Sequence, residues 1–360
     1  MNKKGALIAM SGGVDSSVAA SLMTEKGYEC IGITMKLFDN EGIGLDTEST
    51  CCSADDIEDA RSVCHKIGIP YYVVNFTDAF REKVIDKFVC SYEQGKTPNP
   101  CIECNRCLKF KHLFNKMNEL ELDYIVTGHY ARVEFDENKN RFLLKKAIDD
   151  TKDQSYVLYS LTQEQLSHIQ FPLGELTKAR AREVADKIGL VNADKPDSQD
   201  ICFVKDGKYA DFIKFYTGKE PEKGNFVDIN GNVLGEHKGI IYYTVGQRKG
   251  LGLALNEPMY VKEIDTINNN VILARDCELF TKELEADEIN LITVDEIKEP
   301  MRVKAKVRYR HKEQWATVTQ IGKDRLKVVF DEPQRAITKG QALVMYDGDY
   351  VVGGGTICVV

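Results

Sequence analysis

The chain has no apolar run long enough to cross a bilayer. No stretch of about eighteen consecutive apolar residues occurs in its 360 residues, and the N-terminal MNKKGALIAM leads into a buried strand pattern instead of a signal-peptide cleavage site. Internal repeats, low-complexity tracts and long linkers are missing too. We therefore expect a soluble, cytoplasmic protein of two or three domains that makes no contact with a membrane.

Two widespread nucleotide-binding signatures are also absent. The sequence contains no G-x-x-x-x-G-K-[ST], so no lysine of that loop is placed for γ-phosphoryl transfer. It contains no G-x-G-x-x-G dinucleotide fingerprint either. These absences exclude both well-known phosphate loops.

The cysteine count argues against a complete disulfide framework, because eleven is an odd number. So many thiols are at risk outside the cell, and thiol chemistry or metal binding is the better interpretation. Five cysteines in apolar stretches are predicted to be core residues: Cys30, Cys64, Cys90, Cys277 and Cys358. Cys51 and Cys52 are adjacent and are left unassigned.

The most informative segment that is present is ALIAMSGGVDSS, residues 6–17. A buried strand leads into a Gly-rich turn, and the next ten residues favour a helix that ends near Gly27. Unpaired N–H groups and the helix dipole at such a turn hold anions. Gly12 and Gly13 leave room for a phosphate, and Asp15 is placed to hold Mg²⁺. Three serines add hydroxyl donors: Ser11, Ser16 and Ser17. The turn resembles the pyrophosphate-binding loop of ATP-dependent adenylating enzymes.

Strands and helices alternate over residues 1–205, which predicts a doubly wound, Rossmann-like α/β fold with a parallel sheet. The clearest later elements are helices at 54–68 (capped by Ser53), 78–94 and 106–119 and a strand at 123–131. Residues 206–284 mix a helix with short strands and turns. Residues 285–360 are nearly all short strands, which predicts a small barrel. We therefore predict three domains: 1–205, 206–284 and 285–360.

The net charge of −8 hides a basic segment near the C-terminus. Residues 300–345 carry eleven Lys or Arg against four Asp or Glu. In RVKAKVRYR, five basic residues from Arg302 to Arg310 alternate with apolar ones, which places them on one face of a strand. A solvated strand face would normally mix charges of both signs. The uninterrupted stripe favours a phosphate backbone as its partner.

Two cysteine segments carry candidate chemistry. Cys101, Cys104 and Cys107 lie at C-x2-C-x2-C spacing in TPNPCIECNRCLKF, where Asn105, Arg106 and Lys109 are expected to lower the thiol pKa. Cys202 lies in DKPDSQDICF, where the nearby Asp197 and Asp200 favour its protonated form unless Lys195 or a ligand offsets their charge. A structural zinc knuckle is the alternative for the first segment, and it needs a fourth ligand from elsewhere.

The chain resembles the bacterial tRNA-specific 2-thiouridylases over essentially its whole length. The resemblance rests on the ordered motifs SGGVDSS, NPCIECNRCLKF, TGHYAR, KDQSY, DSQDICF and YTVGQRKGLG. The family replaces the 2-oxygen of the wobble uridine in certain tRNAs with sulfur. The fold that it implies is an adenine nucleotide alpha hydrolase-like sheet followed by a small mixed domain and a β-barrel.

The resemblance also implies a mechanism and its residues. ATP, with Mg²⁺, converts the poor leaving group at C2 of uracil into an adenylate, and sulfur then displaces AMP. Cys202 matches the family's persulfide carrier and Cys104 its nucleophile. The implied ATP contacts are Ala9, Met10, Ser11, Gly12, Gly13, Val14, Asp15, Ser16, Met35 and Gly128. The implied tRNA contacts are Asn99, Pro100, Cys101, His129, Lys152, Asp153, Gln154, Tyr309, Arg310 and Gln341. For His129 alone, a core or capping role would otherwise lead.

Cys101 departs from the family pattern, because many relatives carry Asp at this position. Cys101, Cys104 and Cys202 would offer three thiolates to a [4Fe–4S] cluster, whose fourth iron would bind sulfide. Cluster-bound hydrosulfide is therefore an alternative to the persulfide, and Cys107 is either another ligand or inert. The implied partners are a sulfur donor, such as a cysteine desulfurase or a relay protein, and tRNAs for lysine, glutamate and glutamine.

Two other functions remain as alternatives. An amidating ligase with the same adenylating loop would need an ammonia source, and the sequence has no glutaminase-like segment. A non-catalytic RNA-binding module with a cysteine-bound metal would leave the pyrophosphate loop without a purpose.

Overall fold

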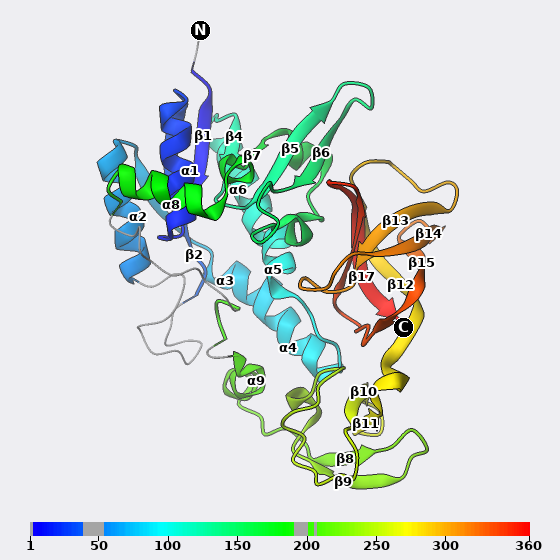
Figure 1. Cartoon of the computed structure of the whole chain (residues 1–360). Coiled ribbons are helices and arrows are strands. Elements are labelled where there is room, and N and C mark those ends of the chain that lie inside the picture. Colours follow the sequence, from blue (N-terminus) through cyan, green and yellow to red (C-terminus); the bar gives the residue numbers. More distant parts are fainter. Residues whose placement is uncertain (1–2, 39–53, 191–200, 205–206) are drawn as a thin grey trace. The chain divides into compact units, whose positions relative to one another are not determined.

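The computed structural model describes residues 3–38, 54–190, 201–204 and 207–360. Contacts divide the chain into two compact units (Figure 1). Unit 1 comprises Met1–Val84, Cys101–Lys205 and Gly348–Val352. Unit 2 comprises Ile85–Pro100, Asp206–Asp347 and Gly353–Val360. Ser53, Cys51 and Cys52 lie outside the described residues.

Unit 1 is built on the predicted parallel sheet. Its strand order is β3 (Tyr71–Asn75), β2 (Glu29–Lys36), β1 (Gly5–Ala9), β4 (Tyr124–Val126) and β7 (Ile169–Gln170), and every pair is parallel. Ala6, Leu7 and Ile8 of the central β1 are fully buried. Burial on both faces explains why this strand reads as a continuous apolar run. The predicted fold class is therefore confirmed for this unit.

Helices pack around this sheet, and the order in which strands are added reverses at β1. Helix α1 (Val14–Glu25) packs against α2 (Ala54–Ile67) and α8 (Lys178–Lys187), while α6 (Phe110–Glu119) packs against β1 and β4 (Figure 1). After β3 the chain returns past β1 to form β4. Sheets of this type bind ligands at such a switch point, outside the carboxyl ends of the strands.

The helical region between β3 and β4 is interrupted by two π-helical turns. Its elements are α3 (Thr77–Phe80), η2 (Arg81–Ile85), α4 (Asp86–Glu93), α5 (Pro100–Glu103), η3 (Cys104–Lys109) and α6. This confirms the helices predicted at 78–94 and 106–119. The remaining helical turns of unit 1 are η4 (Ser155–Leu158), α7 (Gln163–Ser167) and η5 (Pro172–Glu175).

The strand predicted at 123–131 was wrong in its second half. β4 ends at Val126, residues 127–130 form a loop, and a hairpin of β5 (Ala131–Asp136) and β6 (Arg141–Lys146) follows. In this loop Gly128 lies against the backbone of α1: a Cβ there would come within 2.7 Å of the Ser16 amide nitrogen, so the chain approaches the helix here as a glycine loop and not as a strand.

The first part of unit 2 surrounds a small aromatic and aliphatic core. Helix α9 (Tyr209–Thr217) precedes a sheet with the order β10 (Tyr260–Asp265), β11 (Asn270–Ala274), β8 (Gly224–Val227) and β9 (Val233–His237), and η7 (Ile240–Tyr242) follows β9. The core contains Phe226, Tyr243, Val261, Val271 and Leu273. Helix α4 belongs here because Phe88 packs on Phe212 of α9, with ring centroids 6.2 Å apart.

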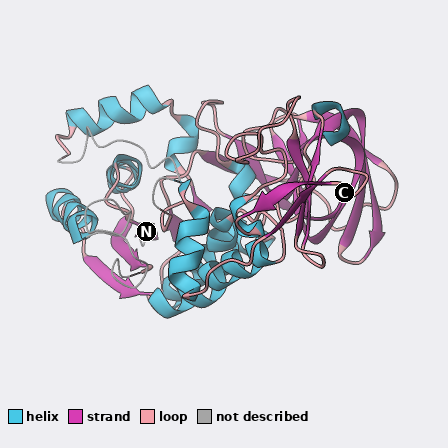
Figure 2. Cartoon of the chain, turned by 90° about the horizontal axis from the view of Figure 1, so that it is seen from below, coloured by secondary structure: helices cyan, strands magenta, loops and turns pink. Residues whose placement is uncertain are grey.

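The second part of unit 2 is the predicted barrel. After η8 (Asp276–Leu279), the strands are β12 (Phe280–Leu291), β13 (Met301–Lys306), β14 (Gln314–Gly322), β15 (Arg325–Arg335), β16 (Ala342–Asp347) and β17 (Tyr350–Val359). Their order is β12-β15-β14-β13-β16-β17, and pairing of β12 with β17 closes the sheet. Closure removes exposed strand edges. Figure 2 shows that strands predominate around the C-terminus.

The basic stripe is only partly as predicted. Val303, Ala305 and Val307 are 1–2% exposed, so the alternation is confirmed up to Lys306, the last residue of β13. The continuous strand face to Arg310 was wrong, because the chain turns at 308–311, where the His311 amide donates to the Arg308 carbonyl. Arg302 is also neutralised by Asp331, with two contacts of 2.8 Å.

The core cysteines were also predicted only in part. Cys30 and Cys64 are buried, and burial raises the pKa of the Cys64 thiol to about 12. Cys358 is half-buried, whereas Cys90 and Cys277 are exposed. Apolar neighbours in sequence did not place these two side chains on the inner face of their helices. Among the described residues, no helix has both the length and the apolar character needed to span a membrane.

Candidate active site

The loop between β1 and α1 has the geometry of an anion site. Gly13 caps α1 in an extended conformation, with φ −90° and ψ 164°, and the helix begins at Val14. Its first intrahelical bond runs from the Ser17 amide to the Gly13 carbonyl. The amides that precede Ser17 therefore have no partner in the preceding turn of α1, and the positive end of the helix dipole lies here.

The serines shape this loop instead of lining it. The Ser16 and Ser17 hydroxyls donate to the Gly13 carbonyl at 3.1 and 2.9 Å, and the Ser11 amide donates to Ser16 Oγ. Ser17 is fully buried and Ser16 is 4% exposed. The expectation that all three hydroxyls reach a phosphate was wrong for Ser17, and only Ser11 is exposed.

Gly12 is required by the fold as well as by any ligand. It has φ +73°, and a Cβ there would lie 2.4 Å from the carbonyl oxygen of Asp56 in the first turn of α2. Gly13, in contrast, faces open space with only Ser11 Oγ nearby. The room for a phosphate that was inferred from both glycines is therefore found at Gly13.

The Asp15 carboxylate is held by two side chains that come from other elements. The Lys178 ammonium, at the start of α8, lies 2.8 and 2.9 Å from its two oxygens, and the Tyr130 hydroxyl donates to it at 2.9 Å. Lys178 is only 9% exposed and Tyr130 is 2% exposed. A nearly buried lysine thus reaches a loop whose sequence supplies none.

Sequence reasoning missed both partners of Asp15. Tyr130 follows Gly128 and His129 in the motif TGHYAR, which is the signal in the sequence that points to it. Lys178 lies in an ordinary amphipathic helix pattern, and nothing local distinguishes it from the other lysines of the chain.

The other predicted ATP contacts lie at the same end of the sheet. The Met10 amide donates to the Ile33 carbonyl of β2, two residues before Met35, and Met35 is 8% exposed. Gly128 follows β4 and lies against Asp15 and Ser16. The structure therefore brings Ala9–Ser16, Met35 and Gly128 together around the β1 carboxyl end.

The first cysteine segment forms one continuous helical region. Cys101 lies in α5 and is exposed, whereas Cys104 and Cys107 lie in η3 and are partly exposed. The Cys107 thiol donates to Glu103 at 3.5 Å, and Glu103 also pairs with Arg106. Cys104 is the first residue of the π-helical turn, a kind of distortion that is frequent at functional sites.

Burial, and not nearby positive charge, dominates the Cys104 thiol. Desolvation raises its pKa above the ordinary value, and the charge of Lys109 opposes this only in part. Arg106 is neutralised by Glu103, and the Asn105 amide donates to the Val157 carbonyl. Lys109 therefore acts in the expected direction, but the expectation of a net lowered Cys104 pKa was wrong, and the resting thiol is protonated at neutral pH.

Cys202 lies in the same unit as Cys104, and packing connects their segments. The ring of Phe203 meets that of Phe80 in α3 at 5.7 Å, and α3 contacts η3. No disulfide joins Cys202 to Cys104. Lys195, Asp197 and Asp200, whose charges were weighed for Cys202, lie outside the described residues.

The described residues contain no group of three His, Cys, Asp or Glu side chains arranged to hold a metal ion. Cys101, Cys104, Cys107 and Cys202 are all within the described range, and they do not converge on one centre here. The donor set for a cluster or a zinc knuckle is thus not assembled in this conformation.

His129 is a neutral imidazole in an aromatic setting. Burial, aided by Lys109, holds its pKa well below the ordinary value. The ring lies 6.0 Å from that of Phe110 and 5.9 Å from that of Phe171, and its Nδ1 contacts Thr127 Oγ1 at 2.7 Å. Any contact that it makes with RNA would use a neutral ring.

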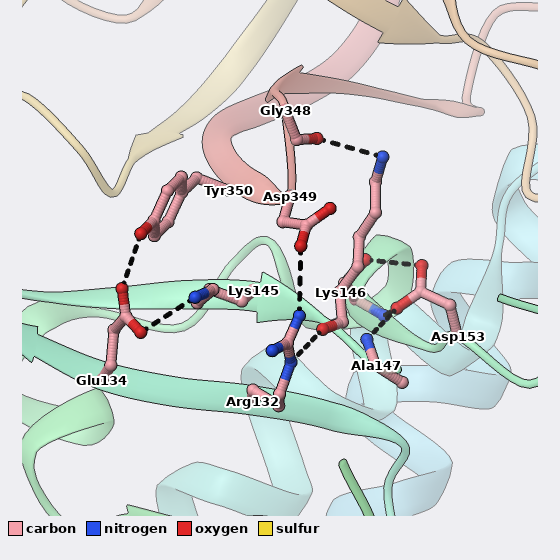
Figure 3. Close-up of polar contacts among 10 residues, drawn as sticks. Arg132, Glu134, Lys145, Lys146, Ala147, Asp153, Gly348, Asp349 and Tyr350 are labelled. Atoms are coloured by element: carbon pink, nitrogen blue, oxygen red, sulfur yellow. Dashed lines mark hydrogen bonds and ion pairs between the residues drawn. The ribbon is translucent and has the colours of Figure 1, made fainter. Parts of the chain in front are cut away.

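The Lys152–Asp153–Gln154 run is tied to its surroundings by two of its side chains. Asp153 accepts from the Ala147 amide at 3.0 Å, next to the contacts that join the β5–β6 hairpin to Gly348–Tyr350 (Figure 3). Gln154 accepts from the Tyr130 amide at 2.9 Å. These two side chains therefore fix the loop beside His129.

Gln341 supports the segment that precedes Asn99 and Pro100 in unit 2. Its amide donates to the Thr97 carbonyl at 2.7 Å, and the Thr97 amide donates to the Lys339 carbonyl at 2.9 Å. Tyr309 and Arg310 are exposed on the turn after β13. Of these predicted tRNA contacts, Gln341 already has an internal partner.

Three family models match the chain in succession. The tRNA methyl transferase HUP domain matches residues 4–206, the tRNA methyl transferase PRC-barrel domain matches residues 210–275, and the Aminomethyltransferase beta-barrel domain matches residues 281–357. The first of these models alone covers more than half of the chain.

Curated relatives match over nearly the full length. The tRNA-specific 2-thiouridylase MnmA of Clostridioides difficile is 54% identical over 357 residues, which are 99% of this chain and 98% of the relative. The protein of the same name from Acetivibrio thermocellus is 54% identical over 358 residues, 99% of this chain and 100% of the relative.

Among solved structures, a 4-thiouridine synthetase in complex with RNA and ATP has a TM-score of 0.37 at 18% identity, over 55% of this chain and 44% of that chain. NMN synthetase from Francisella tularensis has a TM-score of 0.35 at 17% identity, over 61% of this chain and 79% of that chain.

The raised pKa of the Cys104 thiol predicts its reactivity. Because only the thiolate reacts with iodoacetamide, Cys104 should be alkylated slowly at neutral pH and faster as the pH rises. Lys109→Gln removes the charge that opposes the effect of burial, so it should shift this profile to still higher pH. The measurement is mass spectrometry of the Cys104 peptide after alkylation at a series of pH values.

Cys277 in η8 is the control for this experiment, because it is exposed in unit 2 and should not respond to Lys109→Gln. Rapid alkylation of Cys104 at pH 6, or a profile unchanged by Lys109→Gln, would contradict the prediction.

Proposed function

Because the chain belongs to the tRNA-specific 2-thiouridylase family, we propose that it replaces the 2-oxygen of a wobble uridine in tRNA with sulfur, at the expense of ATP. The observation that carries the chemistry is that the anion-binding loop and the cysteines Cys101, Cys104, Cys107 and Cys202 all belong to unit 1. An adenylating loop alone would fit many ligases, and paired thiols alone would fit many redox proteins. Their combination fits sulfur transfer to an activated carbonyl.

The first step is adenylation of the uracil. The C2 oxygen attacks the α-phosphorus of ATP, an O–P bond forms, and pyrophosphate leaves. The amide groups at the start of α1 and the Lys178 ammonium are placed to balance the charge of the departing pyrophosphate. Mg²⁺, when bound, would be held by Asp15 and the phosphates and would neutralise the same charge, once Asp15 exchanges Lys178 for the metal.

The second step transfers sulfur from Cys202. A persulfide on Cys202, supplied by a persulfide-bearing donor, attacks C2 through its terminal sulfur, and AMP leaves. The Cys104 thiolate then attacks the Cys202 sulfur, which releases 2-thiouridine and leaves a Cys104–Cys202 disulfide. An external thiol reductant supplies two electrons to restore both thiols. The protonated Cys104 thiol must lose its proton before it attacks.

The cluster route does not fit the described residues. It needs Cys101, Cys104 and Cys202 on one centre, and these side chains are not grouped in that way. No step is therefore drawn through a [4Fe–4S] cluster. The persulfide route asks only that two thiols meet in turn, which the packing of Phe203 through α3 to η3 supports.

Recognition of tRNA is proposed for all three predicted domains. Residues 1–205 would bind ATP and carry the chemistry, while 206–284 and 285–360 would hold the RNA. Base contact falls to Asn99, Pro100 and Cys101, and further contacts to His129, Lys152–Gln154, Tyr309–Arg310 and Gln341. The proposed substrates are tRNAs for lysine, glutamate and glutamine, the sulfur donor is a cysteine desulfurase or a relay protein, and the proposed location is the cytoplasm.

Cysteine variants test the proposed function directly. Cys104→Ala and Cys202→Ala should each leave tRNA without 2-thiouridine, because one removes the nucleophile and the other the sulfur carrier, while ATP still binds. Cys107→Ala is the matched control on the same helical region and should retain activity. The measurement is 2-thiouridine content by mass spectrometry of digested tRNA. Full activity in either of the first two variants would refute their assignment.

Lys178 is predicted to stabilise bound pyrophosphate charge. Lys178→Met should weaken ATP binding about tenfold or more, since a charge-assisted contact contributes about 1.5–3 kcal/mol. The affinity for tRNA should stay unchanged, and Lys178→Arg should recover part of the loss. ATP binding is measured by titration calorimetry, with thermal unfolding as the check that both variants are folded. A folded Lys178→Met protein with normal ATP affinity would reduce Lys178 to a structural partner of Asp15.

Iron content separates the two sulfur routes. Protein purified without oxygen and freed of iron should thiolate tRNA when given a persulfide donor, and Cys101→Asp should remain active. The measurements are iron and acid-labile sulfide together with 2-thiouridine formation. Activity that depends on stoichiometric iron and is lost in Cys101→Asp would establish the cluster route instead.

A further inference from the structure

A cavity of about 350 Å³ lies in unit 2, between the YTVGQRKGLG segment and the barrel. Its lining comes from three separate parts of the chain: Thr244, Val245, Gly246, Gln247, Arg308, His311, Arg335 and Ala336. The proposed reaction uses none of these residues. YTVGQRKGLG is also the one motif of the sequence to which no role has yet been given.

The ionisable side chains of this cavity are two guanidinium groups and one imidazole. Burial and the charges of Arg308 and Arg335 together hold the pKa of His311 below its ordinary value, so both arginines lie close enough to the ring to repel its proton. Asp276, which is not part of the lining, pairs with Arg335. The lining therefore carries more positive than negative charge.

Arg308 is fixed by contacts that connect the two sides of the cavity. Its Nη2 donates to the Val245 carbonyl at 3.0 Å and to the Ala336 carbonyl at 3.2 Å, and it also contacts the Thr338 hydroxyl. Such a side chain loses little further freedom when an anion binds beside it. The guanidinium is thus preorganised.

The guanidinium of Arg335 contacts a carboxylate on one side and faces the cavity on the other. Nε and Nη2 lie 2.9 and 2.8 Å from Asp276 Oδ1, and the ring of Tyr260 supports the guanidinium at 5.0 Å. Nη1 faces Gly246 and would be 3.4 Å from a Cβ placed there. Gly246 has φ +89°, and its missing side chain keeps this side of the cavity open.

We propose that this cavity binds a backbone phosphate of the tRNA, with Arg335, Arg308 and His311 as its ligands. The inference rests on the proposed function and adds a site to it. An RNA phosphate is favoured over a free phosphate ion because Arg308 and His311 flank Tyr309 and Arg310, which are exposed on the same turn. A strand of RNA that contacts this exposed pair would therefore lie beside Arg308 and His311, which line the cavity.

A matched pair of variants on one strand tests the site. Arg335 and Arg325 both lie on β15, both pair with a carboxylate at 2.8 and 2.7 Å, and their side chains are 37% and 45% exposed. Only Arg335 lines the cavity. Arg335→Gln should weaken binding of an unmodified tRNA transcript about five- to tenfold near physiological salt and lower the slope of log K against log salt by about one. Arg325→Gln should change neither quantity by more than about twofold.

Two further measurements separate a phosphate ligand from a purely structural role. Arg335→Lys keeps the charge but loses the paired contact with Asp276, so it should restore the salt slope. His311→Gln should weaken tRNA binding while thermal unfolding stays near that of the wild type. Equal losses in Arg335→Gln and Arg325→Gln, or a slope that Arg335→Lys fails to restore, would overturn the proposal.

The source of the phosphate is tested with inorganic phosphate alone. Titration calorimetry should show no binding of millimolar phosphate that depends on Arg335. Tight phosphate binding that Arg335→Gln abolishes, with unchanged tRNA affinity, would assign the cavity to a small anion and overturn the RNA assignment. A wild-type protein that binds tRNA but leaves it unthiolated would refute the proposed function and leave the phosphate site standing.

Discussion

The ion pair between Asp15 and Lys178 is the contact on which the nucleotide end of unit 1 depends. It joins the first turn of α1 to the first turn of α8, and the Tyr130 hydroxyl adds the loop after β4 to the same carboxylate. Three elements far apart in sequence thus converge on one charge. Because Lys178 is 9% exposed, its ammonium would be costly to bury without this partner, and the pair holds a cation where an anionic ligand would need one.

Much of this arrangement was predicted from sequence, for reasons that are local. ALIAM is continuous because β1 is buried on both faces, and alternation in RVKAKV marks a barrel strand. The predictions that were wrong concern features that depend on tertiary structure. Cys90 and Cys277 have apolar neighbours but face solvent, and the basic stripe ends at Lys306 because the chain turns there. Lys178 could not be found, since only the fold brings α8 to the loop.

Burial also overrides what the neighbouring residues in sequence suggest about the pKa of the Cys104 thiol. Sequence placed Arg106 and Lys109 beside the thiols, yet Glu103 takes the charge of Arg106, and desolvation outweighs Lys109 at Cys104. A protonated thiol is protected from oxidation and from premature attack on a persulfide.

The barrel also holds the backbone segment of unit 2 that leads to the proposed base contacts. Gln341 and Lys339 hold both hydrogen-bonding groups of Thr97, two residues before Asn99. The turn of Tyr309 and Arg310 belongs to the barrel. A neighbouring loop of the same barrel fixes the segment of chain that leads to the proposed base contacts. Gln341 therefore has an internal role besides its proposed contact with tRNA: its amide fixes the Thr97 carbonyl, two residues before Asn99.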